Sequence, residues 1–303
     1  MRNSLTIFAV SCGISMSAWA GDKPFEVKPG EAVPAKIIST NHLGPFKHDL
    51  PAVLPMVVVS FQTQAADKGS GSGFFGSSGM QYTLEGVSND VMQKIADEAQ
   101  DAIEAELKAG GWQVLPADKL VDIEAYKSWI KSPETSGEEV KRSFFSLGKG
   151  TNTFSSREME RVFVGGKRPL VGNSTVLGGW SAAGSLCQIG KALDAKVILF
   201  RAIVNFANIH AGKNGLFSGQ EWKGSTTLEV SYAEMDVYPP DAKGATPARL
   251  TTDNPVTLHS EFVKDVKKSK SDRTIVADPA RYASDTVEAI RAVAKGFVAE
   301  SGK

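Results

Sequence analysis

The stretch that most suggests chemistry is the glycine-rich segment KGSGSGFFGSSG at residues 68–79, which contains a G-x-G-x-x-G arrangement beginning at Gly71. In dinucleotide-binding proteins this motif joins a strand end to a helix start, so that a pyrophosphate meets the helix N-terminus. Here the strand-like segment ends near Gln64, and helical spacing begins only near Ser88. The spacing therefore favours a mobile loop, or a loop whose two aromatic residues contact a partner, over a phosphate site.

Other patterns associated with catalysis are incomplete. S-x-x-K occurs at Ser128 and at Ser146, but the chain contains neither K-T-G nor S-D-N, and it has no G-x-S-x-G. It also lacks H-E-x-x-H and any Cys/His cluster with zinc spacing. The four histidines, which we interpret as isolated surface residues, are His42, His48, His210 and His259. We predict no catalytic residue, no metal site and no cofactor.

The first twenty residues have the features of a secretory signal. Arg2 gives a positive start, a short apolar run follows, and AWA at residues 18–20 is an A-x-A cleavage site. We expect cleavage after Ala20 and export to the periplasm, with association with the outer membrane as an open alternative. Lipidation of Cys12 is the competing interpretation of this segment. No later apolar run approaches the ~20 residues that a transmembrane helix needs.

Composition narrows the function classes further. Lys and Arg together number 34, as do Asp and Glu, and this balance argues against nucleic-acid binding driven by phosphate neutralisation. Roughly 280 residues would remain after cleavage, enough for one large core or two small ones. Cys187 would then be the only cysteine, so no intrachain disulfide could form, and we interpret it as a small packing residue.

The periodicity predicts an α/β fold, a mixed sheet with helices packed on it. The predicted organisation is a signal peptide at 1–20, an extended lead-in at 21–54, and one α/β domain at 55–303 with an irregular insertion at 132–178. Within the domain we expect strands at 55–64, 112–116, 196–211, 225–238 and 248–262, and helices at 88–109, 119–131, 181–195 and 278–300.

Three finer expectations concern these elements. The apolar spacing in the first and last helices predicts two inward stripes, made of Val91, Ile95, Ala99, Ala102, Ile103 and Leu107, and of Tyr282, Val287, Ile290, Val293 and Phe297. GKNG at 212–215 is typical of a hairpin turn between the two long strands. In the returning strand we expect Leu228, Val230, Tyr232 and Met235 to face inward, with one slip allowed.

Two segments, AGGWQVLPADKL at 109–120 and LDAKVILFRAIV at 193–204, stand where a known family has corresponding ones. In this order of elements the chain resembles the periplasmic domain of the curli secretion channel family and, more loosely, the TolB N-terminal domain. The resemblance covers roughly residues 55–131 and 181–300. It implies an anticodon-binding/TolB-N-like sheet with a long β-hairpin, and a non-enzymatic role in envelope assembly.

The leading hypothesis is an exported, non-catalytic adaptor or assembly factor that recognises other envelope proteins. The expected contacts are apolar residues on Gly-rich segments, namely Phe74, Phe75, Phe144, Phe145, Leu216 and Phe217. These side chains could instead pack back onto the domain.

Two other functions stay open. One is a homo-oligomeric subunit of an outer-membrane secretion channel. Polar residues through the hairpin at 203–232 argue against a lipid-facing surface there, as does the dense charge of the segment at 261–273. The other is an envelope hydrolase, for which the sequence assembles no site.

Overall fold

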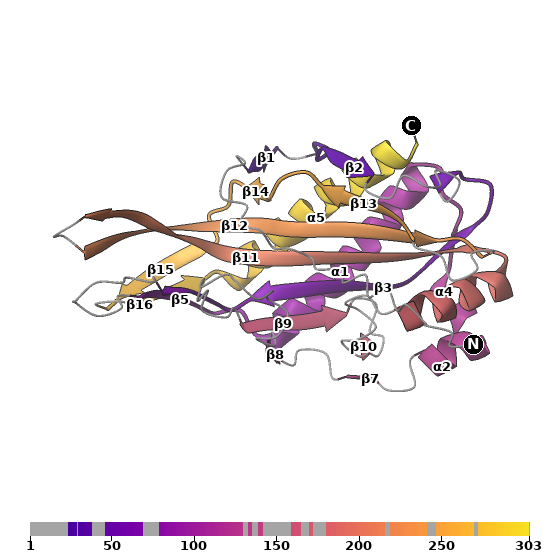
Figure 1. Cartoon of the computed structure of the whole chain (residues 1–303), viewed down its shortest axis with the longest axis horizontal. Helices are drawn as coiled ribbons and strands as arrows, with labels where there is room; N and C mark the ends of the chain where they lie inside the picture. Colours follow the sequence, from indigo (N-terminus) through magenta and orange to yellow (C-terminus); the bar gives the residue numbers. More distant parts are fainter. Residues whose placement is uncertain are drawn as a thin grey trace, which may run out of the picture.

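The computed structural model describes residues 24–28, 30–37, 46–68, 79–129, 133–134, 139–141, 159–164, 170–171, 180–215, 219–240, 247–269 and 272–302. They form the α/β architecture that the periodicity predicts, a curled mixed sheet with helices packed on it (Figure 1).

The main sheet has ten strands, and three of them form its centre. β3 (Ala52–Gln62) runs parallel to β11 (Lys196–Gly215), and β11 pairs antiparallel with β12 (Gly219–Tyr238). The path continues from β3 through β9 to β8, and from β12 through β14 to β1, while β13, β2 and β6 pair beside it. The bounds of these strands are β1 Phe25–Val27, β2 Ala35–Ile37, β6 Val114–Leu115, β8 Glu139–Lys141, β9 Met159–Val164, β13 Ala248–Thr252 and β14 Val256–Leu258.

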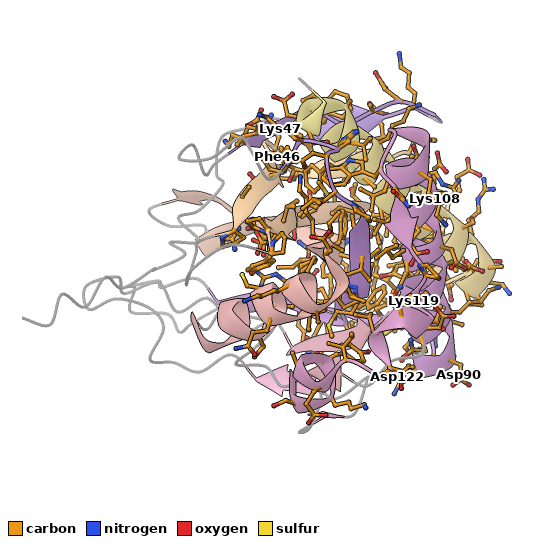
Figure 2. The ribbon with its side chains drawn as sticks, turned by 90° about the vertical axis from the view of Figure 1, so that its right-hand side faces the viewer. Phe46, Lys47, Asp90, Lys108, Lys119 and Asp122 are labelled. Atoms are coloured by element: carbon orange, nitrogen blue, oxygen red, sulfur yellow. The ribbon has the colours of Figure 1, made fainter. Side chains whose placement is uncertain are left out.

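Two long helices cover one face of this sheet. α1 (Asn89–Ala109) begins at Ser88, whose Oγ accepts the Val91 N–H, and α5 (Pro279–Ser301) begins at Asp278. Both predicted stripes face the core, and all their members are buried except Val91, which is partly exposed. Figure 2 shows the side chains packed between the helices and the sheet, with Lys108 on the outer side of α1.

The opposite face carries a smaller core. There α2 (Glu124–Trp129) and α4 (Trp180–Leu193) pack against one end of the sheet, and Leu186 and Ile189 contact the outward side chains of β3 and β11. Where we expected one helix over 119–131, a 3-10 turn (Ala117–Leu120) comes first and α2 follows it.

A second sheet lies at the other end of the molecule. Its order is β15 (Val263–Lys268), β16 (Asp272–Ala277), β5 (Gly79–Glu85) and β4 (Gln64–Lys68). The charged segment at 261–273, which shows no apolar alternation, supplies β15. It forms an edge strand whose lysines are exposed, a common protection against pairing with other chains.

The observed strand pairing corrects further expectations from the sequence. The insertion at 132–178 is not wholly irregular, because β9 pairs with β3 and β8 pairs with β9; β7 (Pro133–Glu134) also pairs with β10 (Leu170–Val171). The single strand expected at 248–262 is two strands, β13 and β14. Residues 212–215 are not a turn, since β11 continues to Gly215, which pairs with Gly219.

The one-residue slip that we allowed in the inward alternation of β12 corresponds to a β-bulge. Ile203 pairs with Tyr232 and Val204 pairs with Val230, so Ser231 is the extra residue. Leu228, Val230 and Met235 reach the helix-covered core as expected, but Tyr232 does not join it. The extra residue shifts the alternation by one position, which turns Tyr232 to the opposite face.

Candidate functional site

The hairpin of β11 and β12 extends beyond the sheet that holds its base (Figure 1). The last β11 residue paired with β3 is Val204, and the last β12 residue paired with β14 is Glu229. The hairpin itself continues from Ala207, which pairs with Thr226, to Gly215. We call residues 207–226 the ribbon. In the described part of the chain the ribbon has no third hydrogen-bonded strand.

Three hairpins end at this side of the molecule. β11 and β12 are connected between Gly215 and Gly219, β4 and β5 between Lys68 and Gly79, and β15 and β16 between Lys268 and Asp272. Figure 1 shows the second sheet beside the ribbon, with these strand ends pointing the same way. An isolated two-stranded ribbon is at best marginally stable in water, so the second sheet and any partner matter for its order.

One close contact ties the ribbon to the second sheet. The buried Tyr82 of β5 lies directly against Gly224 of β12, and a Cβ at residue 224 would stand 2.3 Å from the Tyr82 hydroxyl oxygen. Glycine is therefore the residue that allows this crossing.

All six expected contact residues lie outside the described residues: Phe74, Phe75, Phe144, Phe145, Leu216 and Phe217. The strand ends that flank them are described and paired in all three cases. Phe74 and Phe75 fall between the paired ends of β4 and β5, and Leu216 and Phe217 fall between the paired ends of β11 and β12. The described strand ends on either side of Phe74 and Phe75 and those on either side of Leu216 and Phe217 lie at the same end of the molecule (Figure 1). Phe144 and Phe145 likewise fall between paired strand ends, those of β8 and β9, where Lys141 pairs with Met159.

A second polar feature, which the sequence analysis missed, lies on the sheet face opposite α1 and α5. Arg201 of β11 forms an ion pair with Glu234, its cross-strand neighbour on β12. Arg249 of β13 donates to both carboxylate oxygens of Asp236, at 2.6 and 2.8 Å. The Tyr232 hydroxyl donates to Glu234 Oε2 at 2.5 Å. We call these five residues the charged network.

The network is deeply buried on its acidic side. The Glu234 side chain is 1% exposed and the Asp236 side chain 4%, whereas Arg249 retains 29%. Burial lowers the pKa of Arg201, and the hydrogen bond to Asp236 raises the pKa of Arg249. Burial also raises the pKa of Tyr232. Two bases and two acids balance in charge, so the network stabilises itself rather than presenting a free charge.

Sequence contains a weak signal for this network. Glu234 and Asp236 alternate with Ala233, Met235 and Val237, which usually indicates a strand with one solvated face. Only the strand order shows that Arg201 and Arg249 flank these carboxylates on either side. Pairing between β12 and its two neighbours turns a polar face into a buried one.

A smaller polar contact fixes the chain entering β3. Lys196, at the start of β11 and 3% exposed, donates to the Lys47 carbonyl and to Asp49 Oδ1, the latter at 2.5 Å. Its ammonium also lies 5.8 Å from the centre of the Trp112 ring, on which His48 packs at 4.5 Å between centroids.

This contact predicts a pH dependence. The hydrogen bond from Lys196 lowers the pKa of Asp49 below its usual 3.8. A lowered folded pKa means that the contribution to stability is present above the unfolded pKa and is lost as the pH falls through the folded pKa. We expect thermal melts between about pH 2 and 6 to show a smaller acid-induced loss in Asp49→Asn than in the wild type. Because Asp49 is largely exposed, we expect the difference between the two proteins to be small. An equal acid-induced loss of stability in Asp49→Asn and in the wild type would contradict the contact between Lys196 and Asp49.

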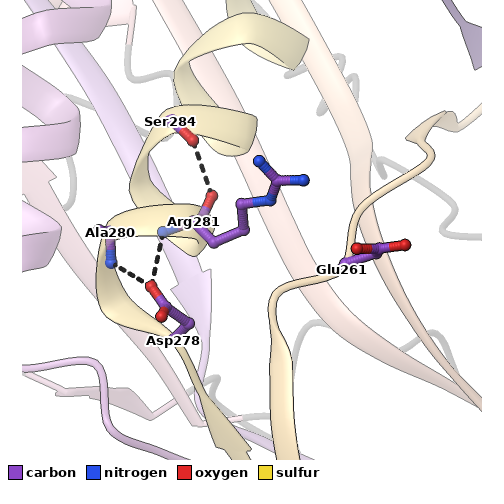
Figure 3. A pocket seen from close by; sticks show the side chains of 5 residues that line it. All are labelled: Glu261, Asp278, Ala280, Arg281 and Ser284. Carbon is purple, nitrogen blue, oxygen red and sulfur yellow. Dashed lines mark hydrogen bonds between the residues drawn. The ribbon is translucent and has the colours of Figure 1, made fainter.

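The start of α5 borders a wide, open hollow (Figure 3). The Asp278 carboxylate accepts the N–H groups of Ala280 and Arg281 at 3.0 and 2.9 Å, and Ser284 Oγ donates to the Arg281 carbonyl. Glu261 lies across the hollow, on the chain that leads into β15. The Asp278 side chain thus caps the helix N-terminus, which explains these polar groups without a ligand.

We next compare the sequence motifs considered as binding or catalytic sites with the structure. Gly71 lies outside the described residues, and the next described element after it is strand β5 rather than a helix. Ser128 is exposed, Ser146 lies outside the described residues, and Cys187 is buried in the smaller core. Among the described residues, no three His, Cys, Asp or Glu side chains group as a metal site.

No protein-family model matches the chain, and no curated protein matches it. Among the helices of the described residues, none is both long enough and apolar enough to cross a membrane.

Proposed function

We propose that this chain is an exported, non-catalytic envelope protein that acts as an adaptor or assembly factor, and that the ribbon is its main contact element. The single observation that carries the proposal is the length of β11 and β12. Their pairing continues to Gly215 and Gly219, well past the last partners on β3 and β14. A strand pair that leaves its own core presents backbone edges and side chains that another protein can use.

The positions of the other hairpins support the proposal that the contact region lies at this end of the molecule. The connections between β4 and β5 and between β11 and β12 carry four of the apolar residues expected to contact a partner. Apolar and aromatic residues are typical anchors of protein interfaces. The buried charged network lies nearer the base of the hairpin, where it fixes the strands from which the ribbon extends.

The test is to shorten the ribbon. Residues 208–225 are replaced by Asn-Gly, which closes a two-residue turn on the Ala207–Thr226 pair. We expect a modest fall in the melting temperature, because the removed residues lie beyond the strands of the main core but include Gly224, against which the buried Tyr82 packs. In the native host, a photo-cross-linker at position 217 should give an adduct of defined mass, and a cross-linker at Lys94, exposed on α1, should not.

The same adduct must depend on the ribbon. In chains carrying the cross-linker at position 74, shortening the ribbon should reduce the yield of partner adducts. The reason is that the strand ends on either side of residue 74 and those at the end of the ribbon lie at one end of the molecule. Adducts equally strong at positions 217 and 94 would show a chance encounter. No adduct at 217 or 74 would remove the adaptor proposal.

A second candidate, the subunit of an outer-membrane secretion channel, is favoured by the register of the ribbon. Positions 207, 209 and 211, which share a face by the two-residue strand period, hold Ala, Ile and Ala. They pair with Thr226, Gly224 and Trp222. Asn208 and His210 fall on the other face by the same period.

Light scattering of the mature chain without detergent separates the two candidates. A mass of one or two chains, with the protein recovered in the soluble fraction, favours the adaptor. A large ring, or recovery from the membrane pellet only with detergent, favours the channel subunit.

A further inference from the structure

The segment at residues 25–37, which we call the strap, completes one margin of the main sheet. β1 runs parallel to β14, with Phe25 opposite Val256, and β2 runs antiparallel to β13, with Ile37 opposite Leu250. The strap therefore covers the free edges of two strands at once. Uncovered edges of this kind readily pair with other chains.

Between its two strands the strap crosses helix α5 at a fitted place. The Val33 N–H donates to the Ala292 carbonyl at 3.1 Å, and the Val33 side chain is 3% exposed. A Cβ at Gly296 would stand 1.9 Å from the Val33 carbonyl oxygen. The absence of a side chain at 296 thus creates the space in which the strap backbone lies. Lys295 adds a hydrogen bond from its ammonium to the Gly30 carbonyl.

The strap is held by a few discrete contacts along its length. Each of its strands has three residues, and Lys36 forms an exposed ion pair with Asp253 at 2.9 Å. Short strands with few buried anchors open at a lower free energy than the global fold. Eight residues separate Ile37 from the buried Phe46, and a chain of that length spans up to about 29 Å when extended.

We propose that the groove formed by β13, β14 and α5 is an acceptor site for the strap of a second copy of this chain. The groove already displays the chemistry that it recognises: two short edge strands, a pocket for Val33 against Gly296, and Asp253 for a lysine. A second copy brings the same residues in the same order, so every contact made within one chain can be made between two. The proposal does not depend on the ribbon.

Binding of a second copy's strap competes with binding of the chain's own strap in the same groove. A tethered segment has an effective concentration in the millimolar range, so exchange between free copies at micromolar concentration is small. It grows where the strap is loosened, because apparent affinity rises with the open fraction of the groove. The expected behaviour is weak exchange in the wild type and strong exchange in a chain whose own strap binds poorly.

The experiment measures strap binding in trans. The probe is a fluorescent synthetic peptide with the sequence of residues 23–38, titrated with the full mature chain and followed by anisotropy. A Val33→Asp chain, whose own strap is weakened, should bind the probe at least about tenfold more tightly than the wild type. A Val33→Asp probe should not bind. A Val33→Ala chain gives a milder second variant if Val33→Asp does not fold by circular dichroism.

A locked strap is the matched control. Lys36→Cys with Thr251→Cys places two cysteines at directly opposite positions of β2 and β13, and Cys187 is buried. The oxidised form should lose probe binding, and reduction should restore it. Mixing chains that carry only Lys36→Cys with chains that carry only Thr251→Cys should give a cross-linked dimer on oxidation. The proposal is overturned if no variant binds the probe, if the locked chain binds it as well as the reduced chain, or if the mixed chains form no such dimer.

Discussion

Replacing Glu234 by alanine should lower the free energy of unfolding by about 3–5 kcal/mol. The carboxylate is 1% exposed and forms ion pairs with Arg201 and, at 3.6 Å, with Arg249. Its removal leaves Arg201, 17% exposed, as a largely desolvated cation. Removing one partner of a buried ion pair costs more than the pair itself is worth, so this single change should be among the most damaging in the sheet.

A double-mutant cycle distinguishes this cause from simple loss of packing. Arg201→Met and Glu234→Leu together remove both charges and keep apolar volume between β11 and β12, so the double variant should be more stable than either single variant. Tyr232→Phe, which removes only the hydroxyl that donates to Glu234, should cost about 1 kcal/mol.

Urea unfolding followed by circular dichroism gives these free energies. Additive costs in the cycle would contradict the charged network, since independent sites show no coupling. A Glu234→Ala cost below about 1 kcal/mol would mean that water reaches this face and screens the pair.

The charged network also bears on register. Arg201 and Glu234 are direct cross-strand neighbours, as are Arg249 and Asp236. A slip of one residue along β12 would turn both carboxylates towards α1 and α5, into the apolar core. The network therefore specifies one pairing of β12 with its neighbours, at the point from which the ribbon extends.

Elements with strong local signals could be predicted from the sequence. α1 and α5 were expected with nearly correct ends, because each combines a 3.6-residue apolar period with an N-terminal capping side chain. β3 and β11 were expected from dense β-branched residues. These signals arise within each element, so no knowledge of neighbours is needed to find them.

The rest depends on contacts between distant segments. β1 and β2 have three residues each, too few to show a period, and they form because β14 and β13 offer edges. β15 is exposed and charged, which hides a strand among loop-like residues. The buried network is invisible from one strand alone, because Glu234 and Asp236 look like a solvated face until Arg201 and Arg249 are placed beside them.

Adding one methyl group at Gly296 should have the opposite effect from adding one at Gly184. Both glycines lie inside helices, where Gly→Ala normally stabilises by roughly 0.5–1 kcal/mol. At Gly184 nothing lies within 4 Å of the new Cβ, so we expect that gain. At Gly296 the Cβ would meet the Val33 carbonyl oxygen at 1.9 Å and its carbon at 2.9 Å, both of them backbone atoms.

The strap must then move away from α5. Its displacement exposes Val27 and Val33, each 3% exposed when docked, and burial of one such side chain is worth about 1.5–3 kcal/mol. We expect Gly296→Ala to cost about 3 kcal/mol in urea unfolding, and Gly184→Ala to raise stability in the same assay.

Combining Gly296→Ala with Val33→Asp locates the damage. If the methyl group acts by displacing the strap, a chain whose strap is already displaced should lose little more, so the two costs should be far from additive. Additive costs would place the effect of Gly296→Ala inside the helix or its core-facing side instead. A neutral Gly296→Ala would mean that the strap backbone can withdraw from α5 while Val27 and Val33 stay buried.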